Sequence, residues 1–330
     1  MPPQTRPDPA ATTSFAPAPV PTARRSPFAV LRRWVDTSDA ANAPDAARGE
    51  RIDWLRAAPF VAMHLACLAV LVVGVSPVAV AVAVALYAIR MFAITGFYHR
   101  YFSHRTFKTS RAVQFAFAVI GVSCVQRGPL WWAAHHRHHH RHADTELDPH
   151  SPKVRGFFWS HAAWFLTPDA FRTHWERIPD LAKFPELRWL DRFDTLVPVV
   201  LAVALYGLGA LLESVAPELH TSGGQMLVWG FFVSTIVLFH ATVTINSLAH
   251  RFGSRRFDTR DDSRNNFWLA LITFGEGWHN NHHFFPGTAR QGFRWWEIDL
   301  TYYGLRTLAA LGLVSDLKPI PAWVRARPEF

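Results

Sequence analysis

The sequence predicts an all-α integral membrane protein, with four transmembrane helices and a cytoplasmic helical cap that holds a histidine-rich metal site. Two observations support this fold class. Two long segments of the 330-residue chain contain almost no charged side chains, and eleven of its 18 histidines fall into three compact clusters beside those segments. Metal-binding imidazoles at the ends of apolar helices indicate a metal centre that reacts with something held in the membrane.

The uncharged segments are each long enough for a pair of spanning helices. Residues 57–89 contain no Asp, Glu, Lys or Arg, and residues 196–250 contain no Lys or Arg. Because a spanning helix needs about 20 apolar residues, we expect helices at 58–73 and 78–97, and at 196–212 and 226–248. The length of these runs disfavours the alternative of a soluble protein with two buried helical hairpins.

The distribution of basic residues predicts the orientation. The turns at 74–77 and 213–225 contain no Lys or Arg, although the chain has a formal net charge of +9. By the positive-inside rule both turns are external, and both termini and a cap made of residues 99–195 and 250–330 are cytoplasmic. We therefore expect a multi-pass protein of the inner (plasma) membrane, with membrane lipids and not nucleic acid as partners. The positive surplus fits this orientation and equally fits attraction to phosphate-bearing head groups.

The N-terminal segment differs from the rest of the chain in composition. Residues 1–48 are rich in Pro, Ala and Arg and show no apolar periodicity. Such a composition predicts a disordered tail ahead of a membrane domain at 49–330.

The histidine clusters are the candidate site. In the predicted topology they all lie on the cytoplasmic side, where His250 also ends the fourth helix one turn after Asn246. A histidine-rich loop that sequesters metal loosely would not explain the third cluster or His250. The clusters are His99-Arg-Tyr-Phe-Ser-His104, the run from His135 to His142, and His279-Asn-Asn-His-His283.

The spacing within the clusters constrains how they bind. On a helix, the three residues of His-x-x-His-His share one face and suit ligands for one ion or for two adjacent ions. His99 and His104 are about 140° apart on an ideal helix, so either they bind different metals or the helix unwinds there. Two registers of the second cluster fit the same pattern: His135/His138/His139 and His136/His139/His140.

Several motifs occur together over most of residues 87–300: the first cluster, Trp132-Ala-Ala-His-His-Arg-His-His-His140, Asp148-Pro-His-Ser-Pro152, Gly156-Phe-Phe-Trp-Ser-His161, Asn246-Ser-Leu-Ala-His250 and Gly275-Glu-Gly-Trp-His-Asn-Asn-His-His283. Together they resemble the membrane fatty-acyl desaturases, the group that includes stearoyl-CoA desaturase and the bacterial delta-9 acyl-lipid desaturases. At Ala134-His135 the animal acyl-CoA enzymes have Arg-Asp instead, and the C-terminal motif is closer to bacterial members, so the acyl carrier stays open between CoA and lipid.

The resemblance implies two iron ions and O₂ as co-substrate. It also implies introduction of a cis double bond at the ninth carbon of a saturated acyl chain, with electrons from a separate ferredoxin or small haem protein and its reductase. No catalytic residue beyond the metal centre and no other cofactor is implied, and the second cluster takes the later register. The implied ligands are His99, His104, His136, His139, His140, His250, His279, His282 and His283, with Asn246 binding through water.

Two other functions are compatible with parts of this pattern. A membrane hydroxylase of acyl chains or lipids would use the same di-iron site, whereas a metal transporter or metal-buffering protein would place its ligands at mid-membrane. His64 and His240 lie within predicted spans, where we expect neutral core histidines. Five acids near the clusters could orient ligand rings through their outer N–H groups, although a surface or helix-cap role is equally compatible with each: Asp144, Asp148, Asp261, Asp262 and Glu276.

Overall fold

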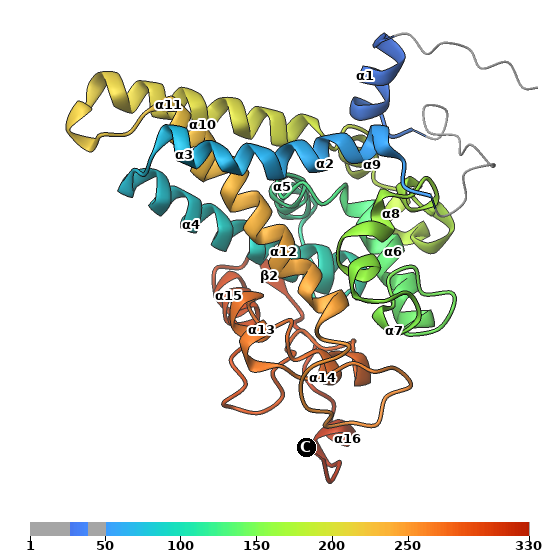
Figure 1. Ribbon diagram of the computed structural model, residues 1–330. Coiled ribbons are helices and arrows are strands. Elements are labelled where there is room, and N and C mark those ends of the chain that lie inside the picture. Colours follow the sequence, from blue (N-terminus) through green and yellow to red (C-terminus); the bar gives the residue numbers. More distant parts are fainter. Residues whose placement is uncertain (1–26, 39–50, 330) are drawn as a thin grey trace, which may run out of the picture.

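The computed structural model describes residues 27–38 and 51–329, and within them the chain is almost entirely helical (Figure 1). The only sheet in these ranges is a two-stranded antiparallel one, β1 (Lys108–Thr109) with β2 (Val314–Ser315). The principal helices are α1 (Pro27–Val35), α2 (Trp54–Ala66), α3 (Val70–Val73), α4 (Pro77–Phe92), η2 (Ala93–Ser103), α5 (Arg111–Val122), α6 (Pro129–His142), α9 (Pro185–Arg192), α10 (Leu196–Val215), η8 (Met226–Val233), α12 (Ser234–Ser247), α14 (His279–Phe284) and α15 (Leu300–Ala310). The shorter elements are η1 (Cys67–Ala69), α7 (Pro152–Arg155), η3 (Trp159–Ala163), η4 (Trp164–Leu166), η5 (Asp169–Phe171), η6 (Trp175–Arg177), α8 (Pro179–Ala182), η7 (Pro217–Leu219), α11 (Gly223–Gln225), α13 (Phe267–Ile272) and α16 (Ala322–Arg325).

Four continuous helical stretches are long and apolar enough to cross a membrane, as the sequence predicts. They are Trp54–Val73, Pro77–Ser103, Leu196–Val215 and Gly223–Ser247, with mean hydropathy between 1.9 and 2.1. Each agrees with its expected range to within a few residues, except that the second continues six residues further, to Ser103. The fold class of a helical membrane protein is confirmed.

The two turns between paired spans lie together at the end of the bundle away from the three histidine clusters (Figure 1). Ser76 caps α4 by accepting from the Ala79 N–H, and its hydroxyl contacts the Thr221 hydroxyl at 2.6 Å. Gln225 donates to the Val73 carbonyl oxygen at 3.0 Å. These polar contacts join the two hairpins at the turns, where backbone groups would otherwise be unsatisfied.

The second span ends as a π-helix, η2, packed against α5. Phe97 of η2 stacks on Phe117 of α5 with ring centroids 3.8 Å apart. Gly121 of α5 permits this close approach, because a Cβ there would lie 2.1 Å from the Tyr98 ring. The contact fixes the part of the span that carries the first histidine cluster.

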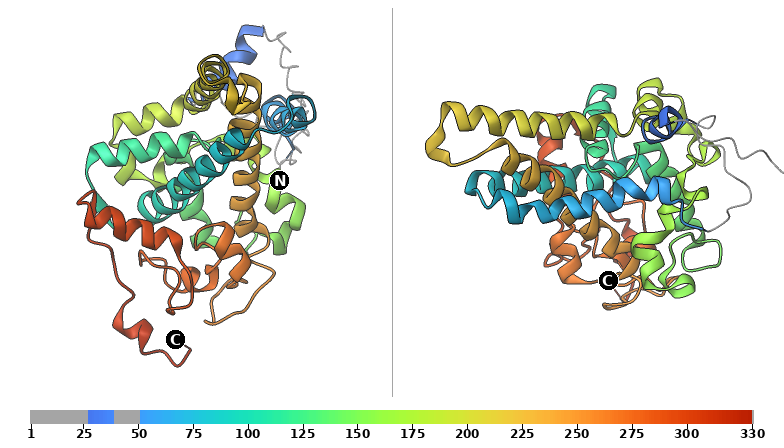
Figure 2. Two further views of the ribbon diagram at one scale, coloured as in Figure 1. Left: turned by 90° about the vertical axis from the view of Figure 1, so that its left-hand side faces the viewer. Right: turned by 45° about the horizontal axis from the view of Figure 1, so that its top comes forward.

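The segments outside the spans gather at one end of the bundle. Figure 1 shows α13, α14 and α15 grouped near the end of α12, with α6 and α7 to their right and α9 higher, near α2, and Figure 2 shows the fold from two further directions. The side chain of Asp191 in α9 accepts hydrogen bonds from the Leu130 and Trp131 N–H groups at 3.1 and 2.8 Å and so caps α6. The first turn of α6, the helix that carries the second histidine cluster, is therefore held by a distant part of the chain.

Part of the N-terminal prediction needs correction. Within the segment expected to be a disordered tail, residues 27–35 form α1. Tertiary contacts that composition does not reveal hold it: the Trp34 indole donates to the Leu55 carbonyl oxygen at 2.9 Å, and Asp36 pairs with Arg192 at 2.8 Å. Residues 1–26 and 39–48 of the expected tail lie outside the described residues.

Candidate metal centre

The π-helical turn resolves the spacing problem of the first cluster. His99 lies in η2 and His104 is the residue that ends it, and the His104 N–H donates to the His99 carbonyl oxygen at 3.3 Å, an i to i+5 bond. Because the π-helical i to i+5 bond brings residues five apart close together along the helix, the two rings lie on the same side of it, with centroids 4.9 Å apart. Of the two expectations, unwinding is the one that the structure shows.

The histidines gather into two groups, a first group of five rings and a second group of four. The second and third clusters lie on α6 and α14, and each of these helices contributes rings to both groups. On α6, residues i and i+4 (His136 and His140) join one group, and residue i+3 (His139) joins another. On α14 the pairing is reversed: residues i and i+4 (His279 and His283) join the second group, and residue i+3 (His282) joins the first. One His-x-x-His-His helix therefore supplies two rings to one group and one to the other, which suits two neighbouring ions.

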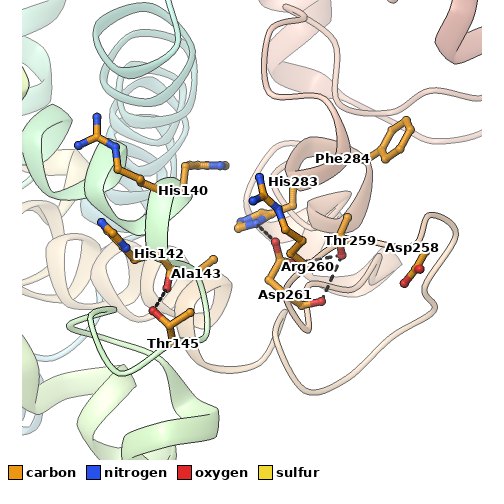
Figure 3. A pocket seen from close by; sticks show the side chains of 11 residues that line it. His140, His142, Ala143, Thr145, Asp258, Thr259, Arg260, Asp261, His283 and Phe284 are labelled. Atoms are coloured by element: carbon orange, nitrogen blue, oxygen red, sulfur yellow. Dashed lines mark hydrogen bonds and ion pairs between the residues drawn. The ribbon is translucent and has the colours of Figure 1, made fainter.

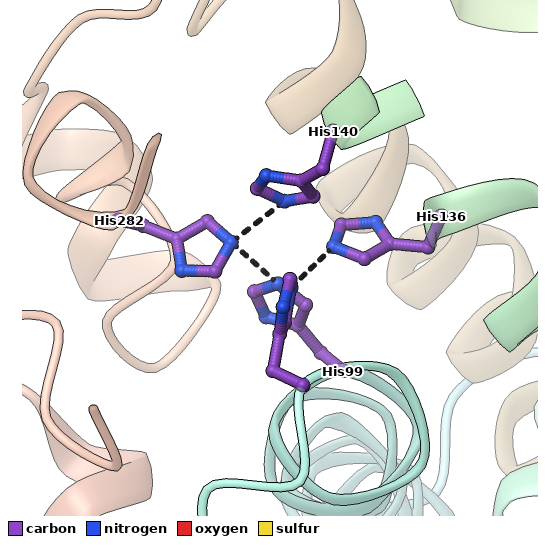
Figure 4. Close-up of side chains that lie close together, drawn as sticks. His99, His136, His140 and His282 are labelled. Atoms are coloured by element: carbon purple, nitrogen blue, oxygen red, sulfur yellow. Dashed lines mark hydrogen bonds between the residues drawn. The ribbon is translucent and has the colours of Figure 1, made fainter. Parts of the chain in front are cut away.

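The first group contains five histidines whose ring nitrogens lie within 4.8 Å of one another (Figure 4). The His282 Nε2 atom lies 3.0 Å from the His99 Nε2 atom and 2.9 Å from the His140 Nε2 atom. A separate Nε2 pair, of His104 and His136, is 2.8 Å apart. Nε2 atoms from three distant segments thus converge on one point. The members are His99, His104, His136, His140 and His282.

The second group contains four histidines. His250 contributes through its Nε2 atom, which lies 3.0 Å from the His279 Nε2 atom. The fourth span ends at Ser247, so His250 lies in the turn after it and does not end the helix as predicted. Asn246 is half-buried in the last turn of α12. The members are His139, His250, His279 and His283.

The structure separates the two registers that the sequence left open. His136 and His140 belong to the first group, and His139 belongs to the second. His135 instead lies 3.2 Å from the Arg172 carbonyl oxygen, and His138 lies 2.9 Å from the Leu147 carbonyl oxygen. Neither of the latter rings belongs to a group.

Three buried or nearly buried aspartates hold the outer nitrogens of the second group. The His139 Nδ1 atom bonds to Asp148 at 3.0 Å, and Asp148 is fully buried. A similar contact joins His250 to Asp144 at 2.7 Å. The third aspartate is Asp261, 2.8 Å from the His283 Nδ1 atom. Such carboxylates orient ligand rings so that the other nitrogen faces the metal.

The fourth acid serves the first group through a network. Glu276 contacts the His99 Nδ1 atom and also pairs with Arg100 at 3.1 Å. Arg100 is 1% exposed and pairs in addition with Asp299 at 2.9 Å. Gln291 donates to Glu276 at 2.9 Å. The sequence pointed to Glu276 but gave no role to Arg100, although Arg100 lies within the first histidine motif, and no motif contained Gln291 or Asp299.

Asp262, the fifth acid that could orient a ligand ring, does not do so. Its carboxylate pairs with Lys153 at 2.9 Å, and only its backbone N–H reaches the site, by donating to Asp144. Asp262 therefore has the surface role that the sequence equally allowed, because its side chain points away from that of its neighbour Asp261.

The protonation of the rings fits metal binding. Burial, followed by repulsion between imidazoles, holds the pKa of five group members well below the usual histidine value, and burial lowers the pKa of His283 to about 4 even though Asp261 opposes it. The pKa of His139 is raised instead, because its interactions with Asp148 outweigh the opposing effect of burial. Neutral imidazoles are the metal-binding form. The five are His104, His136, His140, His279 and His282.

The donor set also fits a metal. The His283 Nε2 atom is buried and has no hydrogen-bond partner among the described residues. A buried nitrogen without a partner is costly unless something else occupies its lone pair. Its outer nitrogen is held by Asp261, so a ring whose inner nitrogen binds a metal accounts for the arrangement.

A further histidine chain lies outside both groups. His64 and His240, expected as neutral core residues, lie with their Nε2 atoms 3.1 Å apart. The chain continues from the His240 Nδ1 atom to His161 at 3.0 Å, and from His161 to the Ser247 hydroxyl at 2.9 Å. This chain links three elements, and no sequence pattern indicated that His161 joins it.

Comparison with known proteins gives the family. A family model described as fatty acid desaturase matches residues 75–314. The sn-1 stearoyl-lipid 9-desaturase of Anabaena variabilis is 35% identical over 271 residues, which are 81% of this chain and 94% of that protein. For the sn-2 palmitoyl-lipid 9-desaturase of Nostoc sp. (strain 36), the identity is 36% over 222 residues, 66% of this chain and 73% of the relative. An acyl-CoA C20 Delta5-desaturase of Anemone leveillei is 39% identical over 226 residues, 68% of each chain.

These matches agree with the geometry. The match to the family model includes every histidine of both groups, and the two groups are able to hold metal ions, of which this family generally uses iron. The chain therefore belongs to the fatty acid desaturase family and is a membrane oxidoreductase.

Proposed function

We propose that the protein is an O₂-dependent fatty-acyl desaturase that introduces a cis double bond at the ninth carbon of a saturated acyl chain, using two iron ions. The observation that carries the proposal is the reciprocal division of α6 and α14, by which each helix supplies imidazoles to two adjoining groups. Two of the relatives are named 9-desaturases, which supports the position of the double bond, and one is named a Delta5-desaturase.

The proposed ligands are the nine histidines of the two groups, with Asn246 binding through water. Two irons with O₂ would supply the oxidising power to break unactivated C–H bonds, which no side chain can supply. The protein's own residues hold and orient. The three aspartates and Glu276 keep the Nδ1 atoms of four rings occupied, so that their Nε2 atoms face inward.

The substrate is proposed to be an acyl chain carried on lipid or on CoA. The relatives include proteins named for lipid-bound and for CoA-bound chains. The ends of the second and fourth spans carry the site, so an acyl tail held among these apolar helices would reach it from the membrane. Its head group would stay at the surface.

We place the site and both termini on the cytoplasmic side of the inner membrane. The turns at the other end of the bundle lack Lys and Arg, which supports this orientation. Electrons are proposed to come from a separate ferredoxin or small haem protein, because the function needs a reductant.

A hydroxylase would use the same site and would differ only in its product. A transporter is disfavoured because the histidines of both groups lie at or beyond the ends of the spans. The second span ends at Ser103, with His99 in its last turn, and the fourth span ends at Ser247. His64 and His240 do face each other from two spans, but their ring nitrogens bond to each other, to His161 and to the Phe60 carbonyl oxygen, and neither belongs to a histidine group that could hold a metal.

The test is lipid analysis after expression in a host that lacks the activity. We expect a new monounsaturated chain, with the double bond located by mass spectrometry of derivatised lipids and the carrier given by the lipid class that is labelled first. His139→Ala, produced at a matched level in the membrane, is the inactive control. An alcohol in place of an alkene would establish the hydroxylase, and an unchanged lipid profile would overturn the proposal.

A further inference from the structure

A polar cavity of about 320 Å³ reaches the point where the two histidine groups meet (Figure 3). One histidine of each group lines it, His140 and His283, and their rings stack with centroids 4.4 Å apart. The cavity thus gives access from outside the protein to both groups at once.

The walls of this cavity do not suit an acyl chain. The walls come from the end of α6 and the residues after it, from the loop between α12 and α13, and from the end of α14. The only apolar side chains among them are Ala143 and Phe284. Thr145 and Thr259 contribute hydroxyls, and the remaining walls are charged or imidazole. A hydrocarbon tail placed in this cavity would face polar walls and would gain few apolar contacts. The occupant must therefore be a polar one.

The charge at the mouth is positive. Arg141 and Arg260 are both exposed and have no carboxylate partner among the described residues. Each acid of the wall already has a cationic or imidazole partner: Asp258 pairs with Arg255 at 3.5 Å, and Asp261 bonds to His283. Two unpaired guanidinium groups therefore flank the opening.

The reaction requires a reductant from outside. Forming one double bond releases two hydrogens from the chain, and these, with two electrons and two protons from elsewhere, reduce one O₂ to two waters. A one-electron carrier must therefore deliver twice per turnover, close to a ligand ring. This cavity offers such a place, because one ring of each group, His140 and His283, lines it.

We propose that this mouth is the docking site of a soluble, acidic electron-carrier protein, whose negative surface faces Arg141 and Arg260. The inference rests on the proposed function. Complementary charge at the rim steers such encounters and makes them sensitive to salt. A phosphate-bearing head group is disfavoured as the occupant, because its acyl chain would have to leave through a polar wall.

The experiment uses the full chain in lipid nanodiscs, with a plant-type [2Fe–2S] ferredoxin as the probe. Arg141→Glu and Arg260→Glu should each weaken ferredoxin binding by roughly tenfold and flatten its salt dependence. Arg260→Gln should give a smaller loss in the same direction. Lys183→Glu reverses an exposed charge at the end of α8, away from the cavity lining, and should bind as the unmodified protein does.

Two further measurements separate docking from function. Iron content, and product formed in a single turnover driven by dithionite, should be unchanged in every variant, because neither depends on the carrier protein. Ferredoxin binding that is absent, or equal in the variants and the Lys183→Glu control, would overturn the docking site. Weakened binding of the acyl substrate with unchanged ferredoxin binding would assign the mouth to a head group instead. Lack of product with dithionite in the unmodified protein would overturn the proposed function, whatever ferredoxin does.

Discussion

Asp261→Asn tests whether a carboxylate sets the metal affinity of the four-histidine group. Asp261 accepts a hydrogen bond from the His283 Nδ1 atom at 2.8 Å, and its side chain is 10% exposed. A hydrogen bond to a charged group in such a setting contributes about 1.5–3 kcal/mol. Since about 1.4 kcal/mol corresponds to a tenfold change, we expect the affinity of this group for iron to fall by roughly 10- to 100-fold, in the range seen when other outer partners of metal ligands are removed.

The assay is chelator competition, with iron counted per chain at each chelator concentration. The neighbouring substitution Asp262→Asn is a matched control, because this side chain pairs with Lys153 and not with a ring. Asp261→Asn should lose one iron at a lower chelator concentration than the unmodified protein, while the second iron is lost at nearly the usual concentration. The reasoning is refuted if Asp261→Asn and Asp262→Asn give the same two-step curve.

Three more predictions follow from contacts already described. His282→Ala removes the ring that faces two other members of its group, so the chain should insert into the membrane yet lose one iron and all product; normal unsaturated lipid would contradict the assignment. Gly121→Ala places a Cβ 2.1 Å from the Tyr98 ring and should lower the free energy of unfolding, followed by thermal denaturation, by about 1–3 kcal/mol, whereas Gly207→Ala, with nothing within 4 Å, should leave it unchanged or slightly raised. His240→Phe breaks both hydrogen bonds of His240 in the chain formed with His64 and His161. It should lower the free energy of unfolding by on the order of 1 kcal/mol, at about 0.6 kcal/mol per bond in a membrane, and leave the iron content unchanged; a loss of iron would show that this chain also supports the metal site.

Much of the architecture could be predicted because it depends on local composition. The hydrocarbon thickness fixes how many apolar residues a span needs, so the two segments with almost no charge, each divided by a turn, located the four helices to within a few residues at most ends. The His-x-x-His-His spacing likewise places three rings on one helical face, whatever that helix packs against. Of the five acids considered as partners of ligand rings, four are in contact with one. Only Asp148 contacts a ring close to it in sequence, whereas Asp144 and Glu276 contact His250 and His99, more than a hundred residues away, so the tertiary structure decided these partners.

By itself, then, the sequence determined the spans and the end of the bundle at which the histidine clusters lie, since both follow from residue type and position along the chain. The proposed set of ligands came from the resemblance to the desaturases, because spacing alone left the register of the second cluster open. Only the tertiary structure decided which ring joins which group and which register of the second cluster is used. It also decided that His99 and His104 lie on the same side of a π-helical turn and that His161 joins a separate chain of histidines. These features depend on how α6, α14 and the ends of two spans pack against one another. Packing between segments more than a hundred residues apart leaves no periodic trace in the chain.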